Sequence, residues 1–314
     1  MKRVGVILAL VVTAACAVAA HGSTAPKVVI RNASGGDLAI GIGSVWVGSH
    51  RGYAVYRINP RTNTKRAIVI PQNSCNFATF AGGYVFQSGC NDTLTTLQID
   101  PRTNKVIRHL QGLFGVGGAG SLWVVDQSGK LGRDDPHTGV RLATIDAGVD
   151  LLSQNGGPIG VFDGGLWVAA DTAVSRVDVE TNKVTKLIPL PGAKGSGAVN
   201  GGYLYGSFGA FLNGKVWVSN PAGLYEVDPA TGSATLLPVR VTPLSVGGDL
   251  QVAAGAGSLW MRTSDHWVAR IDPTSGKVVQ RYAATGGGGG LAVGYGSLWV
   301  GSAGTDSIWR YPIR

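Results

Sequence analysis

The stretch GAGSLWV at residues 118–124 recurs along the chain, and its recurrence predicts the fold. Each copy places turn-forming residues before a short apolar run with an aromatic side chain, which is typical of a hairpin and its second strand. The other copies are GIGSVWV (41–47), AGGYVF (81–86), FDGGLWV (162–168), LNGKVWV (212–218), GAGSLWM (255–261) and GYGSLWV (294–300). The aromatic residues assigned to this slot, Trp46, Tyr84, Trp123, Trp167, Trp217, Trp260 and Trp299, are separated by 38, 39, 44, 50, 43 and 39 residues.

A second phrase follows each of the first six copies and is typical of a tight turn between antiparallel strands. It reads INPRTNTK (58–65), IDPRTNKV (99–106), DDPHTGVR (134–141), VDVETNKV (177–184), VDPATGSA (227–234) and IDPTSGKV (271–278). Asp or Asn caps such a turn, Pro fixes φ, and Gly or Asn accepts the left-handed conformation that closes it. Each unit therefore contains four strands, and the chain predicts an all-β, seven-bladed β-propeller with the aromatic side chains between adjacent blades.

The seventh unit is one strand short. It contains SLWVGS and SIWRYPI but no Asp-Pro turn and no fourth strand. At the other end, PKVVIRNAS (26–34) is one β-like run more than the first unit needs. We expect this run to complete the last blade and close the ring without a covalent link, so that 26–314 forms a single propeller domain.

The N-terminus reads as an export signal over residues 1–20. Lys2 and Arg3 precede an uncharged apolar run, Val4 to Ala20, and small residues around Ala19 offer a cleavage site. The same run is almost long enough to be retained as a membrane anchor. Lipidation at Cys16 is a third alternative. Each of the three places the rest of the chain outside the cytoplasm, either secreted or in the bacterial cell envelope.

Cysteine usage agrees with an oxidising compartment. Apart from Cys16, the chain has Cys75 and Cys90, on two β-like runs that flank Gly82 and Gly83. A two-residue turn at these glycines would place the two cysteines opposite each other and predicts a disulfide. The alternative is a pair of buried thiols.

Composition and charge exclude several classes of protein. The 49 glycines follow no Gly-X-Y period, and 44% hydrophobic residues argue against disorder. The formal net charge is +9, yet no nucleic-acid motif is present, and we expect a monomer. Basic side chains on the outer rim would either deter edge-to-edge aggregation or attract an anionic envelope surface. They are Arg61, Lys65, Arg66, Arg102, Lys105, Arg108, Lys183, Lys186, Lys277 and Arg281.

Polar residues in the loops between second and third strands are the candidate site. In a propeller these loops converge on one mouth of the central channel, where they can bind a ligand. The ligand-binding candidates are Arg51, Asp92, Asp126, Asp171, Arg262 and Asp306. His50, Asp265 and His266 are the candidates for acid–base catalysis or metal binding, although Asp265 and His266 are adjacent and would point to opposite faces of a strand.

The combination of GSLWV and IDPxTGKV phrases resembles the YVTN-type and streptogramin-lyase-like (virginiamycin B lyase-like) propellers of bacterial envelopes. The resemblance covers residues 26–314 and implies the seven-bladed fold. It also implies a histidine and a glutamate near a magnesium ion. The glutamates of this chain, Glu180 and Glu226, lie in or just before Asp-Pro-type turns and do not match that pattern.

Two functions follow as hypotheses. In the first, the protein is an exported binding or scaffold module that holds a protein, glycan or small molecule at the channel mouth. In the second, it is an envelope enzyme of lyase or lactonase type with a divalent metal, Mg²⁺ or Ca²⁺, in the channel. The first is favoured because the sequence offers no acid–base pair that can be placed, and no cofactor is predicted for it.

Overall fold

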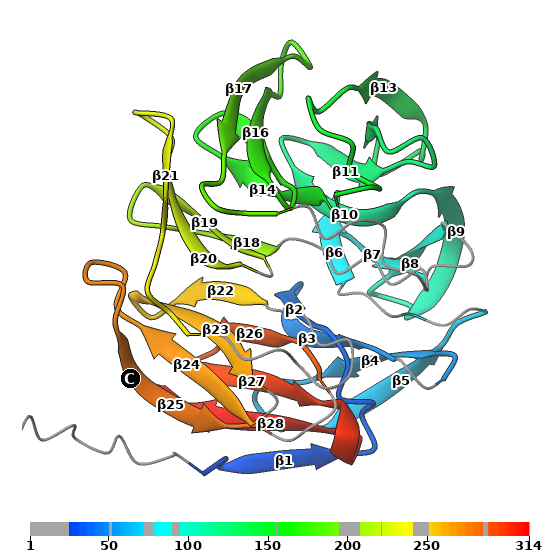
Figure 1. Cartoon of the computed structure of the whole chain (residues 1–314). Coiled ribbons are helices and arrows are strands. Elements are labelled where there is room, and N and C mark those ends of the chain that lie inside the picture. Colours follow the sequence, from blue (N-terminus) through cyan, green and yellow to red (C-terminus); the bar gives the residue numbers. More distant parts are fainter. Residues whose placement is uncertain are drawn as a thin grey trace, which may run out of the picture.

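The structure is a computed structural model that describes residues 25–49, 52–71, 74, 78–89, 95–154, 156–194, 208–220, 222–240, 251–264, 266–284 and 288–313. These residues form seven four-stranded antiparallel sheets arranged as the blades of a ring (Figure 1). The first strands of neighbouring blades contact each other all the way round, so they form the wall of a central channel. The predicted seven-bladed β-propeller is confirmed.

Six blades are built from consecutive strands, in the order first to fourth from the channel outward. Blade 1 consists of β2 (Leu38–Gly41), β3 (Ser44–Gly48), β4 (Ala54–Ile58) and β5 (Lys65–Val69). Blade 2 consists of β6 (Ala78–Ala81), β7 (Tyr84–Ser88), β8 (Thr95–Asp100) and β9 (Lys105–Gln111). Blade 3 consists of β10 (Leu113–Gly118), β11 (Ser121–Val125), β12 (Leu131–Asp134) and β13 (Arg141–Ile145).

The second half of the ring repeats this order. Blade 4 consists of β14 (Gly157–Phe162), β15 (Gly165–Ala169), β16 (Ala173–Asp178) and β17 (Val184–Pro189). Blade 5 consists of β18 (Phe208–Leu212), β19 (Lys215–Asn220), β20 (Gly223–Asp228) and β21 (Ser233–Leu236). Blade 6 consists of β22 (Val252–Gly255), β23 (Ser258–Ser264), β24 (Trp267–Ile271) and β25 (Val278–Ala283).

Blade 7 takes strands from both ends of the chain. It consists of β26 (Leu291–Gly294), β27 (Ser297–Ser302), β28 (Ser307–Pro312) and, outermost, β1 (Val28–Arg31), with the 3-10 helix η1 (Ala303–Thr305) between β27 and β28. β1 pairs antiparallel with β28, from Val28 opposite Arg310 to Arg31 opposite Ser307. The predicted closure by the N-terminal strand is therefore confirmed (Figure 1).

The first hairpin of every blade turns through two residues with positive φ, as a type I′ turn requires. In blade 5 these residues are Asn213 (φ 54°) and Gly214 (φ 74°). The tryptophan that follows donates from Nε1 to the carbonyl just before the turn, as Trp217 does to Leu212 at 3.1 Å. The same bond is made by Trp46, Trp123, Trp167, Trp260 and Trp299. The repeated tryptophan thus holds its own hairpin as well as filling the core.

The core consists of separate clusters, each between two adjacent blades. Trp123 of blade 3, for example, is fully buried against Leu166 and Val168 of blade 4. Blade 2 differs from the sequence expectation, because Phe86 and not Tyr84 occupies the aromatic slot. Phe86 is fully buried, whereas Tyr84 pairs with Ala81 beside the turn. The assignment of Tyr84 to this slot was wrong by two residues. Because every second residue of a strand points to the same side, Tyr84 and Phe86 lie on the same face.

The register of the first hairpin in blade 2 bears on the cysteine prediction. Gly82 and Gly83 form its turn, and the pairing runs from Ala81 opposite Tyr84 to Ala78 opposite Gln87. The predicted turn and register are therefore present. Cys75 and Cys90 themselves lie outside the described residues, so the disulfide stays a prediction.

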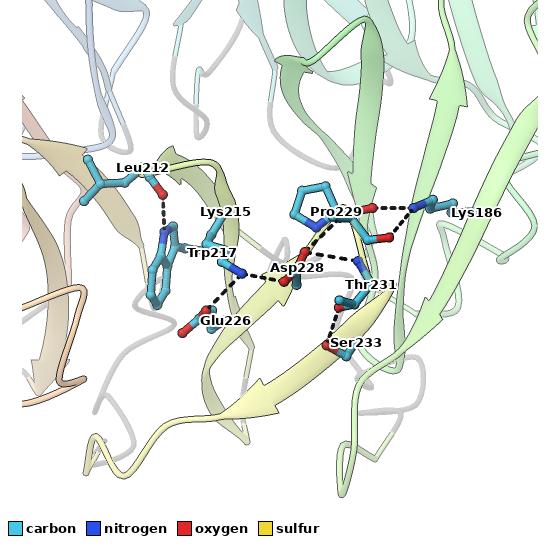
Figure 2. Close-up of polar contacts among 10 residues, drawn as sticks. Lys186, Leu212, Lys215, Trp217, Glu226, Asp228, Pro229, Thr231 and Ser233 are labelled. Atoms are coloured by element: carbon cyan, nitrogen blue, oxygen red, sulfur yellow. Dashed lines mark hydrogen bonds and ion pairs between the residues drawn. The ribbon is translucent and has the colours of Figure 1, made fainter.

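The turns between third and fourth strands have the predicted capping chemistry. In blade 5, Asp228 Oδ1 accepts hydrogen bonds from the N–H groups of Ala230 at 2.8 Å and Thr231 at 3.2 Å (Figure 2). Its Oδ2 accepts a hydrogen bond from Lys215 Nζ at 2.5 Å. The bond from Lys215, together with the two N–H groups, lowers the pKa of Asp228 to about 2. Lys186 of blade 4 donates to the carbonyl of Ala230 at 3.3 Å and so ties two blades together (Figure 2).

An arginine on the third strand links each of three blades to the next one. Arg57 of β4 stacks on Trp46, with its guanidinium carbon 5.1 Å from the ring centre. Its Nε donates to Ser44 Oγ at 2.9 Å. Its Nη1 reaches the turn of blade 2, where it donates to the carbonyl of Pro101 at 2.6 Å and to Asn104 Oδ1 at 3.1 Å.

Arg133 and Arg310 occupy the same place in blades 3 and 7. Each stacks on the tryptophan of its own blade and donates to a carbonyl and an asparagine of the next blade's turn. Gln98 replaces the arginine in blade 2 and donates to the carbonyl of Pro136 at 2.9 Å. Part of the positive charge of the chain therefore holds the ring together.

Candidate functional site

The channel wall is closely packed because glycines on the first strands receive large side chains from the next blade. A Cβ added at Gly294 of blade 7 would lie 2.9 Å from the side chain of Ile40 in blade 1. A Cβ at Gly41 would lie 2.5 Å from the ring of Phe80 in blade 2. These contacts bring the first strands close together and leave a narrow channel.

A cavity of about 150 Å³ lies in this channel. First strands of six blades, or the residue just before them, contribute to its wall. The lining residues are Leu38, Val116, Pro158, Ile159, Phe208, Gly209, Gln251, Val252 and Leu291. Several of them are the first residues of their strands. The starts of these strands lie at the end of the channel where the connections between blades and the predicted binding loops also lie. The side chains of the wall are aliphatic and aromatic except that of Gln251, but polar atoms, including backbone groups, make up about half of the surface that faces the cavity.

Gln251 stands just before β22 and is held in place by backbone groups. Its Oε1 accepts a hydrogen bond from the N–H of Leu291 at 2.5 Å, and a Cβ at Gly290 would lie 2.7 Å from the same oxygen. Its carbonyl accepts the N–H of Arg262 at 3.3 Å. The side-chain oxygen of Gln251 is therefore hydrogen-bonded within the wall, and its Nε2 amide is the group that can donate a hydrogen bond to a polar atom in the cavity.

Arg262 was predicted in the loop between second and third strands, but it lies within β23 and is fully buried. Its Nη1 donates to the carbonyls of Gly289 and Gly301, at 2.9 Å each. Both acceptors belong to blade 7 or to the connection leading into it. Arg262 thus joins blades 6 and 7 beside the channel, and its guanidinium is not presented to solvent.

The glycine-rich run before β26 has a structural role in this seam. Within its described part, Gly290 N–H donates to the carbonyl of Gly36 at 3.3 Å. A Cβ at Gly289 would lie 2.4 Å from the carbonyl oxygen of Gly35, and one at Gly301 would lie 2.4 Å from that of Gly36. Backbone therefore packs directly on backbone where the two ends of the chain meet, and side chains other than hydrogen cannot fit.

Asp126 and Asp171 lie in the predicted loops but are engaged within the protein. Asp126 Oδ1 accepts hydrogen bonds from the Ser128 hydroxyl at 2.7 Å and from the N–H of Lys130 at 3.1 Å. Burial alone would raise the pKa of Asp126, but these hydrogen bonds lower it below its ordinary value. Asp171 is buried, and its carbonyl accepts a hydrogen bond from Asn220 Nδ2 of blade 5 at 2.8 Å.

Asp306 and His266 are exposed at two other loops of the same end. Asp306 follows η1 in the left-handed region (φ 49°), and its carbonyl accepts the N–H of Ala33 at 3.1 Å. The N–H of His266 donates to Ser264 Oγ at 3.3 Å. The other predicted site residues, His50, Arg51, Asp92 and Asp265, lie outside the described residues.

The described candidates do not assemble into one set. Among the residues that the structure describes, no group of three or more His, Cys, Asp or Glu side chains is placed to hold a metal ion. The divalent metal considered from the sequence therefore stays a prediction. Over the same described ranges, no helix has the length and apolarity needed to cross a bilayer.

Two residues of the site were missed by sequence reasoning. Gln251 and Asp37 each stand immediately before the first strand of a blade, and the backbone of Asp37 packs on Gly290 next to Gln251. The sequence signal for these two residues is a polar side chain directly before the first strand of a blade.

Comparison with known proteins supports the fold class and stops there. No family model matches the chain, and no curated protein matches it either. Solved structures do: BamB from Moraxella catarrhalis is 17% identical, with a TM-score of 0.58 over 87% of this chain and 80% of that one.

A computationally designed protein, Ika8, is similar to the same extent. It is 13% identical, with a TM-score of 0.59 over 88% of this chain and 82% of that one. At this level of identity the likeness shows the fold alone. The chain is thus a seven-bladed β-propeller, and its resemblance to streptogramin-lyase-like proteins stays a prediction.

Proposed function

We propose that the protein is an exported binding propeller of the bacterial cell envelope, which holds an apolar group of a partner in its channel cavity. The observation that carries the proposal is the wall of that cavity, in which Gln251 is the polar side chain among aliphatic and aromatic neighbours. The cavity has a volume of about 150 Å³, which is enough for a molecule as large as benzene. A leucine or phenylalanine side chain of a partner fits the same description.

The chemistry of the wall also separates this function from its alternatives. A glycan is a poorer occupant, because among the described side chains of the wall Gln251 alone can replace hydrogen bonds that the glycan's hydroxyl groups make with water. A lyase or lactonase requires acid–base groups or metal ligands around the substrate. Of the described wall residues, Gln251 offers an amide and the others offer hydrocarbon.

The loop residues predicted from sequence would then form the rim of this site. Asp306 and His266 are exposed there and can contact polar parts of the same partner. Asp126 and Asp171 would shape their loops, because their oxygens already accept hydrogen bonds within the protein. Recognition would thus combine one buried apolar group with a polar surround, as is common at protein interfaces.

Small probes that imitate side chains test the proposal. Toluene and isobutanol stand in for Phe and Leu, and binding is followed by NMR of the methyl groups of Leu38, Val252 and Leu291. We expect saturable shifts of these methyl signals. In Val116→Phe the larger ring fills the cavity and the shifts should disappear. Val140→Phe, on an exposed outer edge, is the matched control and should bind as the native protein does. Shifts that survive in Val116→Phe, or their absence in the native protein, would overturn the proposal.

Export is tested separately. The protein recovered from the envelope or the medium should begin near residue 20 if the signal is cleaved, and should carry a lipid on Cys16 if that residue is modified. Mass spectrometry distinguishes these forms and detects the Cys75–Cys90 disulfide in the same sample. A chain found unprocessed and reduced in the cytoplasm would contradict the export part of the proposal.

A further inference from the structure

One end of the ring carries the tight turns of the blades. Adjacent strands are antiparallel, so the turn between first and second strands and the turn between third and fourth strands lie at the same end of a blade. The connections between blades and the predicted binding loops lie at the other end. We call the end with the tight turns the turn end.

One exposed position distinguishes the blades at the turn end. It stands two residues after the Asp or Asn that caps the turn between third and fourth strands, and its N–H donates to that capping side chain. In blade 1, for example, the N–H of Arg61 donates to Asn59 Oδ1 at 2.8 Å. The turn therefore uses the backbone of this residue and does not prescribe its side chain. From blade 1 to blade 6 the residue is Arg61, Arg102, His137, Glu180, Ala230 and Thr274, all of them exposed.

The side chains at this position belong to a wider separation of charge. Among the turn residues and their direct neighbours, blades 7, 1 and 2 have one described carboxylate, Asp100. Their basic residues are Lys27, Arg61, Lys65, Arg102 and Lys105. In blades 3, 4 and 5 acidic residues prevail, and Asp134, Asp135, Asp163, Asp178, Glu180 and Asp228 accompany Arg141, Lys183 and Lys215. We call these two parts the basic sector and the acidic sector, and blade 6 lies between them with Asp272 and Lys277.

Two bulky apolar side chains stand within the basic sector. Ile42 of blade 1 and Tyr295 of blade 7 are the first residues of their hairpin turns, in the left-handed region (φ 47° and 51°), and both are exposed. The first strands of these two blades contact each other, so the two turns are adjacent. In the other blades the same position holds a small or polar residue, namely Gly82, Ala119, Asp163, Asn213 and Ala256. Positive φ is unfavourable for a β-branched or bulky residue, and such strain is retained where a site requires the side chain.

We infer that the turn end is the interface of a two-fold symmetric dimer of this chain. In a ring of seven blades, blade 1 lies opposite the boundary between blades 4 and 5, so the basic and acidic sectors occupy opposite halves of the turn end. A two-fold axis in the plane of this end, perpendicular to the line that joins the sectors, places each basic sector on the acidic sector of the other copy. The complementary charges then meet twice.

A second copy accounts for more of this pattern than an acidic peptide does. An acidic peptide would find complementary charge in the basic sector and would leave the acidic sector unused. A second copy uses both sectors and brings Ile42 and Tyr295 over the turns of blades 4 and 5. There the half-buried rings of Phe162 and Phe211 are stacked, with their centroids 5.1 Å apart, and offer apolar surface. The predicted binding loops of both copies face outward, so the proposed binding function stays available.

Sedimentation of the chain from His21 onward tests the dimer. All strands of the ring lie between Val28 and Pro312, so the propeller is complete in this form. We expect a monomer–dimer equilibrium whose dissociation constant rises about tenfold between about 50 mM and about 500 mM NaCl, because salt screens exposed charges. A monomer at every concentration, as expected from the sequence, would overturn the inference, and so would a dimer that salt does not weaken.

Charge reversal at the exposed turn position locates the interface. Two variants, Arg61→Glu with Arg102→Glu and Glu180→Arg with Ala230→Arg, should each weaken the dimer about thirtyfold. Each changed residue acts twice in a two-fold interface, and an exposed pair contributes about two- to threefold. An equimolar mixture of the two variants should dimerise about tenfold more tightly than either alone, because the changed sectors are again complementary. A mixture no tighter than its components would overturn the two-fold arrangement.

The control reverses as much charge at the other end of the ring. Lys130→Glu with Lys194→Glu changes exposed residues beside the predicted binding loops and the connections between blades, and the dissociation constant should change less than about twofold. An equal loss in this control and in Arg61→Glu with Arg102→Glu would show that net charge alone is responsible and would overturn the assignment to the turn end. Circular dichroism confirms that each variant remains folded.

The apolar part of the interface is tested by Ile42→Asn with Tyr295→Asn. Asparagine tolerates the left-handed conformation, so the fold should not lose stability. The dimer, however, should dissociate about tenfold more readily, because both apolar side chains are lost from each copy. Val69→Ser with Leu187→Ser, exposed on outer strands, is the control and should leave the dissociation constant unchanged. A dimer of the asparagine variant as tight as the native one would overturn the assignment of this surface.

Discussion

Blades 5 and 7 have the same four-stranded architecture, yet they are completed in different ways. In blade 5 the third and fourth strands are joined by a short turn, which Asp228 caps and which Lys186 of blade 4 holds from outside. In blade 7 the third strand is β28 and the fourth is β1, which comes from the other end of the chain. The two sheets therefore have the same geometry whether or not their strands are consecutive in the chain. The contacts that stabilise the fourth strand, however, differ between them.

The closure costs more entropy than a hairpin does. Pairing β1 with β28 closes a loop of about 280 residues, whereas the turn of blade 5 closes about four, and the logarithmic cost of loop closure differs by about 4 kcal/mol. Blade 7 also lacks a turn between its third and fourth strands. In blades 2, 4 and 1 this turn accepts hydrogen bonds from an arginine of the preceding blade, namely Arg57, Arg133 and Arg310. Beside blade 7, buried Arg262 and direct backbone packing between glycines make the contacts to the neighbouring blades instead.

Removing β1 should have the largest effect. A protein that lacks residues 1–34 loses the pairing with β28 and the buried side chains of Ile30 and Ala33. We expect the midpoint of thermal unfolding to fall by roughly 10 °C or more, given that about 1 kcal/mol corresponds to 2–4 °C in a protein of this size class. Removal of residues 1–20 alone is the control and should leave the midpoint unchanged. An added peptide of residues 26–34 should restore part of the loss. Equal midpoints for both truncations would contradict closure by β1.

Arg262→Met should come next. The variant leaves the carbonyls of Gly289 and Gly301 without their buried donor, and we expect a loss of about 3 kcal/mol in the free energy of unfolding. Arg57→Met is the matched control on a half-buried link between blades 1 and 2, where about 1 kcal/mol is expected. Urea unfolding measures both. If the two variants lose the same amount, burial at the seam is not the reason that Arg262 stabilises the ring.

Acid should weaken blade 5 before blade 7. The folded-state pKa of Asp228 is about 2, below its ordinary value of 3.8, so the carboxylate stabilises the protein above about pH 4 and loses this contribution as the pH falls toward 2. Blade 7 has no such turn. Hydrogen exchange, corrected for its intrinsic pH dependence, should show β20 and β21 opening at pH 2.5 while β1 and β28 remain protected.

The control for this prediction is Asp228→Asn. Asparagine can still cap the turn, as Asn59 does in blade 1, but it cannot pair with Lys215 through a charge. The variant should be less stable than the native protein at pH 6 and should lose less on acidification. If blade 5 of this variant opens at the same pH as in the native protein, Asp228 is not the titrating group.

The smallest effect is expected at the turns of the first hairpins. Tyr295 of blade 7 has φ 51° and Asn213 of blade 5 has φ 54°, in the left-handed region that asparagine tolerates and tyrosine does not. Tyr295→Asn should therefore stabilise the protein by about 0.5–1 kcal/mol, and the reciprocal Asn213→Tyr should destabilise it by a similar amount. Thermal unfolding measures both changes. A loss of stability in Tyr295→Asn would indicate that the tyrosine ring makes contacts that outweigh its backbone strain.

Much of the fold was predictable because its signals are local. Turn residues such as Asp228 and Gly214 act on residues within a few positions of themselves, and equivalent residues recur along the chain. The repeat also contains the information that places Phe86, and not Tyr84, in the aromatic slot of blade 2. In the other blades the aromatic residue stands three positions after the second turn residue, as Trp46 does after Gly43, and the same offset from Gly83 leads to Phe86.

The candidate site was much less predictable. Arg262 has the spacing of a loop residue, but the strand continues through it, and its Nη1 donates to carbonyls 27 and 39 positions away. Gln251 enters the channel wall because β22 starts at the next residue. Neither position belongs to a repeated phrase, so the repeat did not single it out.

The sequence by itself determined the number of blades, the place of the six repeated tryptophans in the core and the closure by the N-terminal strand. It could do so because turn chemistry and the alternation of side chains depend on near neighbours. The tertiary structure decided which polar groups are buried, how the glycines of residues 35–36 meet those of 289–290, and which side chains line the channel cavity. These features depend on contacts between blades, and blades become neighbours only when the ring forms.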